Sequence, residues 1–174
     1  MKIRLLPALV LLVLVAPTQA TAQSLNDAQV AHAAVTANQI DIANAELALE
    51  RAADSEVRRF AETMIQDHEA VIDQAVALAE ELGVTPEDNH LSRALLAGNE
   101  EVRDRLSGLR GRAFELAYIE HEIAFHQAVI EAVREVLIPE TTVDPLADLL
   151  EAVLPALEAH LEHARTVQAG IEDG

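Results

Sequence analysis

Four long segments of the chain carry apolar residues at helical spacing, and sharp breaks separate them. Alanine, leucine, glutamate, valine and isoleucine dominate these segments, while glycine and proline are sparse inside them, as is typical of helices. The segments are residues 26–53, 56–82, 112–138 and 144–170. We therefore predict an all-α fold with four main helices.

The breaks predict where each helix begins and ends. Ser55 can cap the second helix, and Gly83 suits the left-handed position that follows it. Pro139 is expected to end the third helix, and Asp144 followed by Pro145 to begin the fourth as cap and first helical residue.

Residues 83–111 form a longer connection, in which LSRALLAGNEEVRDRLSGL predicts one or two short helices. A short hairpin, a long crossover and a second short hairpin are the connectivity of a ferritin-like bundle. We therefore predict an antiparallel four-helix bundle with a long crossover between the second and third main helices. Residues 23–174 should form this single domain.

Residues 1–22 are predicted to be a signal peptide. Lys2 and Arg4 give a basic start, the apolar run is shorter than the roughly 20 residues that a membrane-spanning helix needs, and ATA at residues 20–22 suits cleavage. We expect an exported, periplasmic protein that begins at Gln23 and has no integral membrane segment after cleavage. The chain has no cysteine, which excludes lipid attachment and thiolate metal sites.

The chain is strongly acidic, with a formal net charge of −18. Such a chain should repel nucleic acid and anionic membrane surfaces, and it could attract cations, although an acidic surface also favours solubility. Aromatic residues make up only 2%, which argues against stacking pockets for sugars, haem or bases.

The segment AYIEHEIAFHQAVI, residues 117–130, places polar residues on an apolar helix face. At about 100° per residue, counted from Tyr118, Glu122 and His126 fall at about 40° and 80°, on either side of a stripe centred at about 60°. Glu120 and His121 point to solvent or to the rim. A buried polar group without a partner costs on the order of 2–7 kcal/mol, so the two inward residues need partners.

The other main helices each offer an inward polar residue too: Asp41, His68 and His160. Asp41 lies 13 residues before the break at Asp54 and His68 lies 14 residues after it, which puts both at one height in an antiparallel hairpin. His160 lies 16 residues after Asp144.

The second hairpin shows the same match of heights. Glu122 and His126 lie 16 and 12 residues before Ile138, at the level of His160. We therefore expect Asp41, His68, Glu122, His126 and His160 to form one polar cluster.

Imidazole with carboxylate suits zinc, copper(II), iron or manganese, so one interpretation is a bundle that binds a divalent transition metal for metal handling or envelope stress protection. The alternative is a metal-free structural or interaction module of the cell envelope, in which a buried histidine–carboxylate network fixes the helix register. A third interpretation is an oxidoreductase that uses the metal with Tyr118 nearby.

Three stretches resemble the exported bacterial family named domain of unknown function 4142: FAETMIQDH, YIEHEIAFH and LPALEAHLEHA. The resemblance covers residues 27–169. It implies a ferritin-like helical fold, a periplasmic or outer-membrane location, and no established biochemical role. It also carries Asp67, His68, His126 and His160 over as motif positions.

The sequence departs from the di-iron ferritin pattern, which places a glutamate three residues before an inward histidine on two of the helices. Here Ile65 precedes His68, and Leu157 precedes His160. A mononuclear, histidine-rich site therefore fits the sequence better than a ferroxidase centre.

Overall fold

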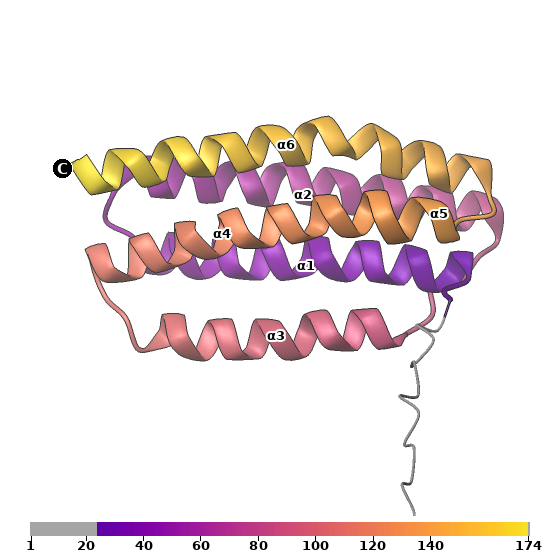
Figure 1. Cartoon of the computed structure of the whole chain (residues 1–174), viewed down its shortest axis with the longest axis horizontal. Coiled ribbons are helices and arrows are strands. Elements are labelled where there is room, and N and C mark those ends of the chain that lie inside the picture. Colours follow the sequence, from indigo (N-terminus) through magenta and orange to yellow (C-terminus); the bar gives the residue numbers. More distant parts are fainter. Residues whose placement is uncertain (1–23, 174) are drawn as a thin grey trace, which may run out of the picture.

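The computed structural model of the protein describes residues 24–173, which are helical apart from short connections (Figure 1). The long helices are α1 (Asp27–Arg51), α2 (Ser55–Leu82), α3 (His90–Ser107), α4 (Arg112–Ala132) and α6 (Asp144–Asp173). A π-helical turn, Val133–Leu137, and the short α5, Ile138–Glu140, continue α4. The all-α prediction is confirmed for these residues. The predicted signal peptide, residues 1–22, lies outside them.

Side-chain caps fix the ends of α2, with one correction to the prediction. Asp54, not Ser55, is the N-cap, because its carboxylate accepts the backbone N–H groups of Glu56 and Val57 at 2.7 and 3.2 Å. Ser55 is the first helical residue. Gly83 ends the helix in the left-handed region with φ 64°, as predicted.

The prediction that Pro139 ends the third main helix is wrong, because the helical path continues to Glu140. A proline inside a helix lacks an N–H and clashes with the carbonyl four residues before it. The preceding turn is π-helical, and the N–H of Ile138 reaches the carbonyl of Val133. This wider turn accommodates the proline. The last helix also runs further than predicted, to Asp173.

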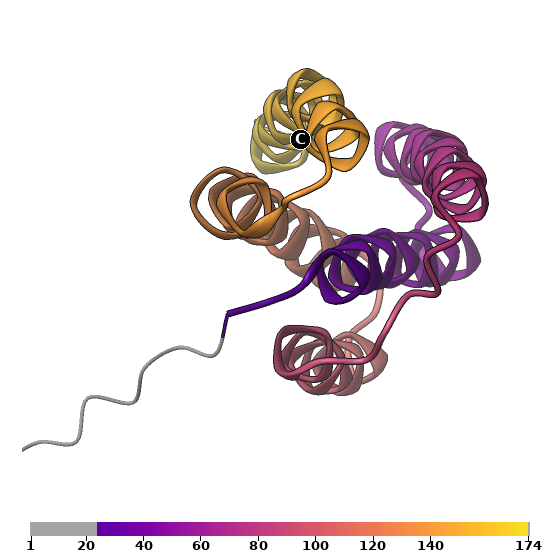
Figure 2. The ribbon, with the colours of Figure 1, turned by 90° about the vertical axis from the view of Figure 1, so that its right-hand side faces the viewer.

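Four helices surround a common interior. α1 packs against α2 and α4 packs against α6, each pair antiparallel, while contacts of α2 with α6 and of α1 with α4 close the ring (Figures 1 and 2). α3 lies outside this ring, along α1 and α4 (Figure 2). The connection at residues 83–111 therefore contains one helix of 18 residues, which runs back along the molecule.

Two apolar clusters fill the interior. One contains Phe60, Met64 and Tyr118, and the other contains Ile130 and Leu150. On α1 and α4 the polar residues predicted to face inward lie between these clusters, and on α6 His160 lies at the end of the second cluster, between Leu157 and Leu161. Among residues 24–173, no helix has both the length and the apolar character of a membrane span.

Candidate metal centre

The structure brings the five predicted residues together and buries them all. Each helix of the ring contributes: Asp41 from α1, His68 from α2, Glu122 and His126 from α4, and His160 from α6. Glu122 and His126 are fully buried, and the most exposed member, His160, retains only 6% of its accessible surface. Helical periodicity therefore identified the inward faces correctly.

The three imidazole rings form a compact triangle. Ring centroids are 5.8 Å apart for His68 and His126, 5.5 Å for His126 and His160, and 5.3 Å for His68 and His160. One nitrogen from each ring lies within 4.8 Å of the other two. A single ion could therefore contact all three rings after small side-chain adjustments.

In each imidazole ring, one nitrogen donates a hydrogen bond to an oxygen. His68 donates from Nδ1 to Asn38 Oδ1 at 2.7 Å, and His126 donates from Nδ1 to the carbonyl oxygen of Glu122 at 2.9 Å. His160 donates from Nε2 to Asp67 Oδ2 at 2.9 Å. The amide of Asn38 is oriented because its Nδ2 donates to a backbone carbonyl one turn earlier.

These three bonds determine which nitrogen carries the proton, because a carbonyl or carboxylate oxygen only accepts. In a neutral imidazole the opposite nitrogen then has a lone pair. Those opposite nitrogens are Nε2 of His68, Nε2 of His126 and Nδ1 of His160, and all three are buried without a hydrogen-bond partner. Three buried lone-pair nitrogens, each oriented by an outer hydrogen bond, thus belong to rings whose centroids lie within 5.8 Å of one another, and outer hydrogen bonds of this kind orient the histidines of metal sites.

Two carboxyl groups adjoin the triangle. Asp41 Oδ2 lies 3.3 Å from Nε2 of His68 and 3.6 Å from Nε2 of His126, and Glu122 Oε2 lies 3.6 Å from Nδ1 of His126. All four oxygens of Asp41 and Glu122 lack a hydrogen-bond partner. Asp41, Glu122 and His126 form a second group of three that each offer a ligand atom within 4.8 Å of the others, so a cation bound at this end of the cluster would satisfy some of these oxygens.

Burial controls protonation in the cluster. Desolvation, with a further contribution from the neighbouring imidazoles, lowers the pKa of His68 to about 3 and that of His126 to about 4. Desolvation also raises the pKa of Asp41 to about 8, and it raises the pKa of Glu122 well above its usual value, assisted by the charge of Asp41. At neutral pH both histidines are therefore in the uncharged form that a metal requires.

Some polar residues at the site were missed in the sequence. Asn38 was not identified, although it lies three residues before Asp41 on the same helix face. Asp67 was identified only through the family resemblance. Glu120 is exposed and His121 is half-buried at the rim, as expected; Nε2 of His121 lies 3.2 Å from Nδ2 of Asn44, outside the cluster.

The chain matches one family model and is similar to two solved structures. The family model described as "Domain of unknown function (DUF4142)" matches residues 14–167. A DUF305 protein of Streptomyces coelicolor, described as secreted, is similar with a TM-score of 0.69 and 15% identity, over 84% of this chain and 93% of that chain. CopM in its Cu(II)-bound form is also similar, with a TM-score of 0.63 and 16% identity, over 85% of this chain and 99% of that chain. No curated protein matches the chain. These low identities show a shared fold alone.

Proposed function

We propose that this chain, which belongs to the DUF4142 family, binds one divalent transition metal ion between its four inner helices through His68, His126 and His160. The observation that carries this proposal is that three buried imidazole rings can each offer one nitrogen within 4.8 Å of the others, while each ring also has a nitrogen without a hydrogen-bond partner. Asp41 is the nearest carboxylate and would serve as a fourth ligand, with Glu122 beside it.

Copper(II) is the ion that the donor set favours, followed by zinc. Imidazole nitrogen binds both ions well, and copper(II) binds most tightly along the divalent series. The chain has no cysteine, so it offers no thiolate for copper(I). CopM, which is similar in fold, is described in a Cu(II)-bound form, and this supports copper for the present site. Manganese usually favours more oxygen ligands than this site supplies, and iron(II) binds less tightly than copper(II) along the divalent series.

The role that fits such a site is metal handling or envelope stress protection. We assign α1, α2, α4 and α6 to an antiparallel four-helix bundle of ferritin-like connectivity, with α3 as the crossover. The predicted signal peptide and the secreted description of the DUF305 protein support export, with the periplasm as the expected location.

A metal-free structural module is the second candidate, and one distance favours it. Asp41 Oδ2 lies 3.3 Å from Nε2 of His68, and the raised pKa of Asp41 leaves a carboxylic acid proton that can be donated to this nitrogen. In that case the cluster would fix the packing of the four helices without any ion.

Metal titration of protein purified without a histidine tag and stripped with a chelator separates the two candidates. Wild type should bind about one equivalent of copper(II), and His126→Gln, which replaces a ligand nitrogen with an amide, should bind at least about tenfold more weakly. His90→Gln changes an exposed histidine and should bind as wild type does. Absence of binding by wild type, or equal affinity in wild type and His126→Gln, would overturn the proposal.

A further inference from the structure

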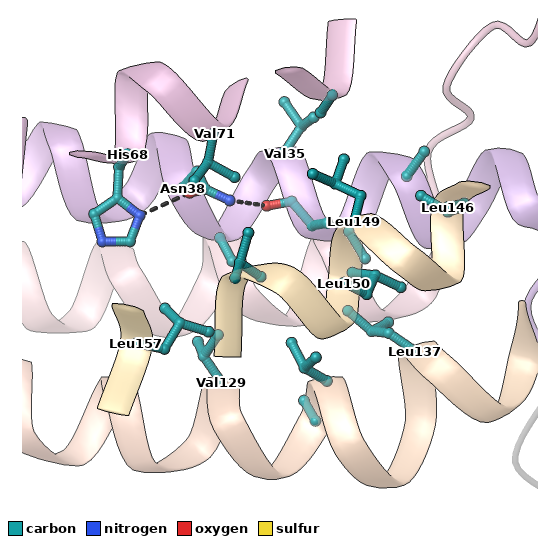
Figure 3. A pocket seen from close by; sticks show the side chains of 18 of the residues that line it. Val35, Asn38, His68, Val71, Val129, Leu137, Leu146, Leu149, Leu150 and Leu157 are labelled. Atoms are coloured by element: carbon teal, nitrogen blue, oxygen red, sulfur yellow. Dashed lines mark hydrogen bonds between the residues drawn. The ribbon is translucent and has the colours of Figure 1, made fainter. Parts of the chain in front are cut away.

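A cavity of about 570 Å³ lies beside the histidine cluster, between the four inner helices (Figure 3). Its walls are aliphatic, with Val71 from α2, Val129 from α4 and Leu149, Leu150 and Leu157 from α6 around it. The volume falls within the range of about 300–1,000 Å³ that is usual for small-molecule sites.

Small side chains on α1 and α2 leave this space open. α1 presents Ala34 and Ala37 to the cavity, and α2 presents Ala75 and Ala79. The other half of α2 fills its interior with Phe60 and Met64, but no residue of α2 beyond His68 is fully buried. An apolar space of this size costs stability when it is unfilled, so an apolar occupant would stabilise the fold.

The cavity has a polar end. His68, His126 and His160 line it, and each has a buried lone-pair nitrogen without a hydrogen-bond partner. Asn38 and Asp67 also lie at this end, but they already bind His68 and His160. Asp41 lines this end too, 3.3 Å from Nε2 of His68, and neither of its oxygens has a hydrogen-bond partner. The lone-pair nitrogens at this end are hydrogen-bond acceptors, which require a donor from the occupant.

Charge restricts the occupant further. No lysine or arginine lines the cavity, and the residues with ionisable carboxyls that line it are Asp27, Asp41 and Asp67. An anionic head group would find no cation there and would enter a chain of net charge −18. A cationic head group would meet Asp27, Asp41 and Asp67. The oxygens of Asp27 and Asp67 already accept hydrogen bonds from Thr142 and His160, so only Asp41 is free to pair with it, and the dodecylamine arm of the test below measures that competing case.

We propose that this cavity binds one long-chain alcohol, with an alkyl or isoprenoid chain between α2 and α6 and its uncharged hydroxyl at the histidine end. The hydroxyl donates its hydrogen bond to one of the lone-pair nitrogens. This binding goes beyond the proposed metal function and does not require the ion, because the apolar walls and the acceptors are present in the metal-free protein.

The test uses metal-stripped protein and the uncharged fluorescent probe N-phenyl-1-naphthylamine. The probe should bind, and dodecanol should displace it at a concentration about tenfold lower than dodecane does, the difference expected from one hydrogen bond. Dodecanoate should compete more weakly than dodecanol. Failure of the probe to bind, or displacement by dodecanoate or dodecylamine at equal or lower concentration than dodecanol, would overturn the proposal.

Matched variants locate the binding. Ala75→Phe fills the cavity from α2, whereas Ala77→Phe makes the same change at an exposed position that does not line it. Ala75→Phe should lose probe binding and keep its unfolding temperature, and Ala77→Phe should bind as wild type does. Should Ala75→Phe not fold, Ala79→Phe makes the same change at a half-buried position one turn later on α2, with Ala77→Phe again as its control. Wild-type binding by a folded filling variant would refute the location. Copper titration is a separate measurement, so either proposal can fail alone.

Discussion

Removal of the Asp67 carboxylate tests whether the outer hydrogen bond of His160 prepares a metal ligand. Asp67 Oδ2 accepts from Nε2 of His160 at 2.9 Å, and this bond leaves Nδ1 as the lone-pair nitrogen. In Asp67→Ala the imidazole is free to place its proton on Nδ1 instead, which blocks coordination. Because the Asp67 side chain is 44% exposed, water can take its place at Nε2.

The expected size of the effect follows from metal linkage. With copper(II) at about 100 times its dissociation constant, wild type gains about 2.7 kcal/mol of unfolding free energy. Loss of an outer-shell partner typically weakens metal affinity about 10–100-fold, so the same concentration should stabilise Asp67→Ala by about 0.4–1.4 kcal/mol. For a chain of this length, these values correspond to increases in unfolding temperature of about 5–10 °C for wild type and about 1–5 °C for the variant.

Thermal unfolding followed by circular dichroism, with and without copper, provides the assay. Without metal, Asp67→Ala should lose no more than about 1 kcal/mol of unfolding free energy, since the hydrogen bond that it removes is partly exposed. Asp73→Ala removes an exposed acid from the same helix and should respond to copper as wild type does. A copper-induced shift in Asp67→Ala equal to that of wild type would refute the reasoning. Equal destabilisation with and without copper would favour the metal-free network.

Three further predictions concern other parts of the chain. Stability of the metal-free protein should fall as pH rises toward about 8, by up to about 1.4 kcal/mol per pH unit from Asp41, because folded Asp41 keeps its proton up to a pKa of about 8 whereas the unfolded chain loses it near 3.8. The fall should be clear only above about pH 6.5, because below it the unfolded chain protonates His68 and His126, whose lowered pKa values keep them neutral in the folded protein, and this opposes the effect of Asp41. Denaturant titrations should show a smaller slope in Asp41→Asn, and a flat wild-type profile from about pH 6.5 to 8 would contradict this. Glu115→Ala should lower the free energy of unfolding, measured with urea, by about 1–3 kcal/mol, because the buried Glu115 carboxylate accepts two backbone N–H groups in the α1–α2 turn. The control Glu131→Ala changes an exposed glutamate and should be nearly neutral. Intact-mass measurement of exported protein should show cleavage after Ala22, and retention of residues 1–22 would contradict the predicted signal peptide.

The helices were largely predictable because their signals are local. Gly83 takes the left-handed conformation that ends α2, and the apolar periodicity identified the inward faces of the four inner helices. The errors concern helix ends, namely the residue that caps α2 and the residue at which the third main helix stops. Asp54 and Ser55 are both good caps, and which of them caps depends on backbone angles that composition does not determine. Pro139 is tolerated because the turn before it is π-helical.

The sequence by itself determined which inward residues of each hairpin lie at the same height. Helical rise and short hairpins place Asp41 opposite His68, and Glu122 and His126 opposite His160, whatever the surrounding packing. Residue spacing could not determine which nitrogen of each imidazole is free. That depends on acceptors such as Asn38 and Asp67, which reach the rings across helix interfaces, and a change of acceptor would move the proton.

Only the tertiary structure decided where the interior is packed and where it is open. Alanine on α1 and α2 is compatible with close helix contact as well as with a cavity. The outcome depends on how far apart α2 and α6 lie, and that separation is set by all four inner helices together. The aliphatic space beside the histidines is therefore a property of the assembled helices and of no single segment.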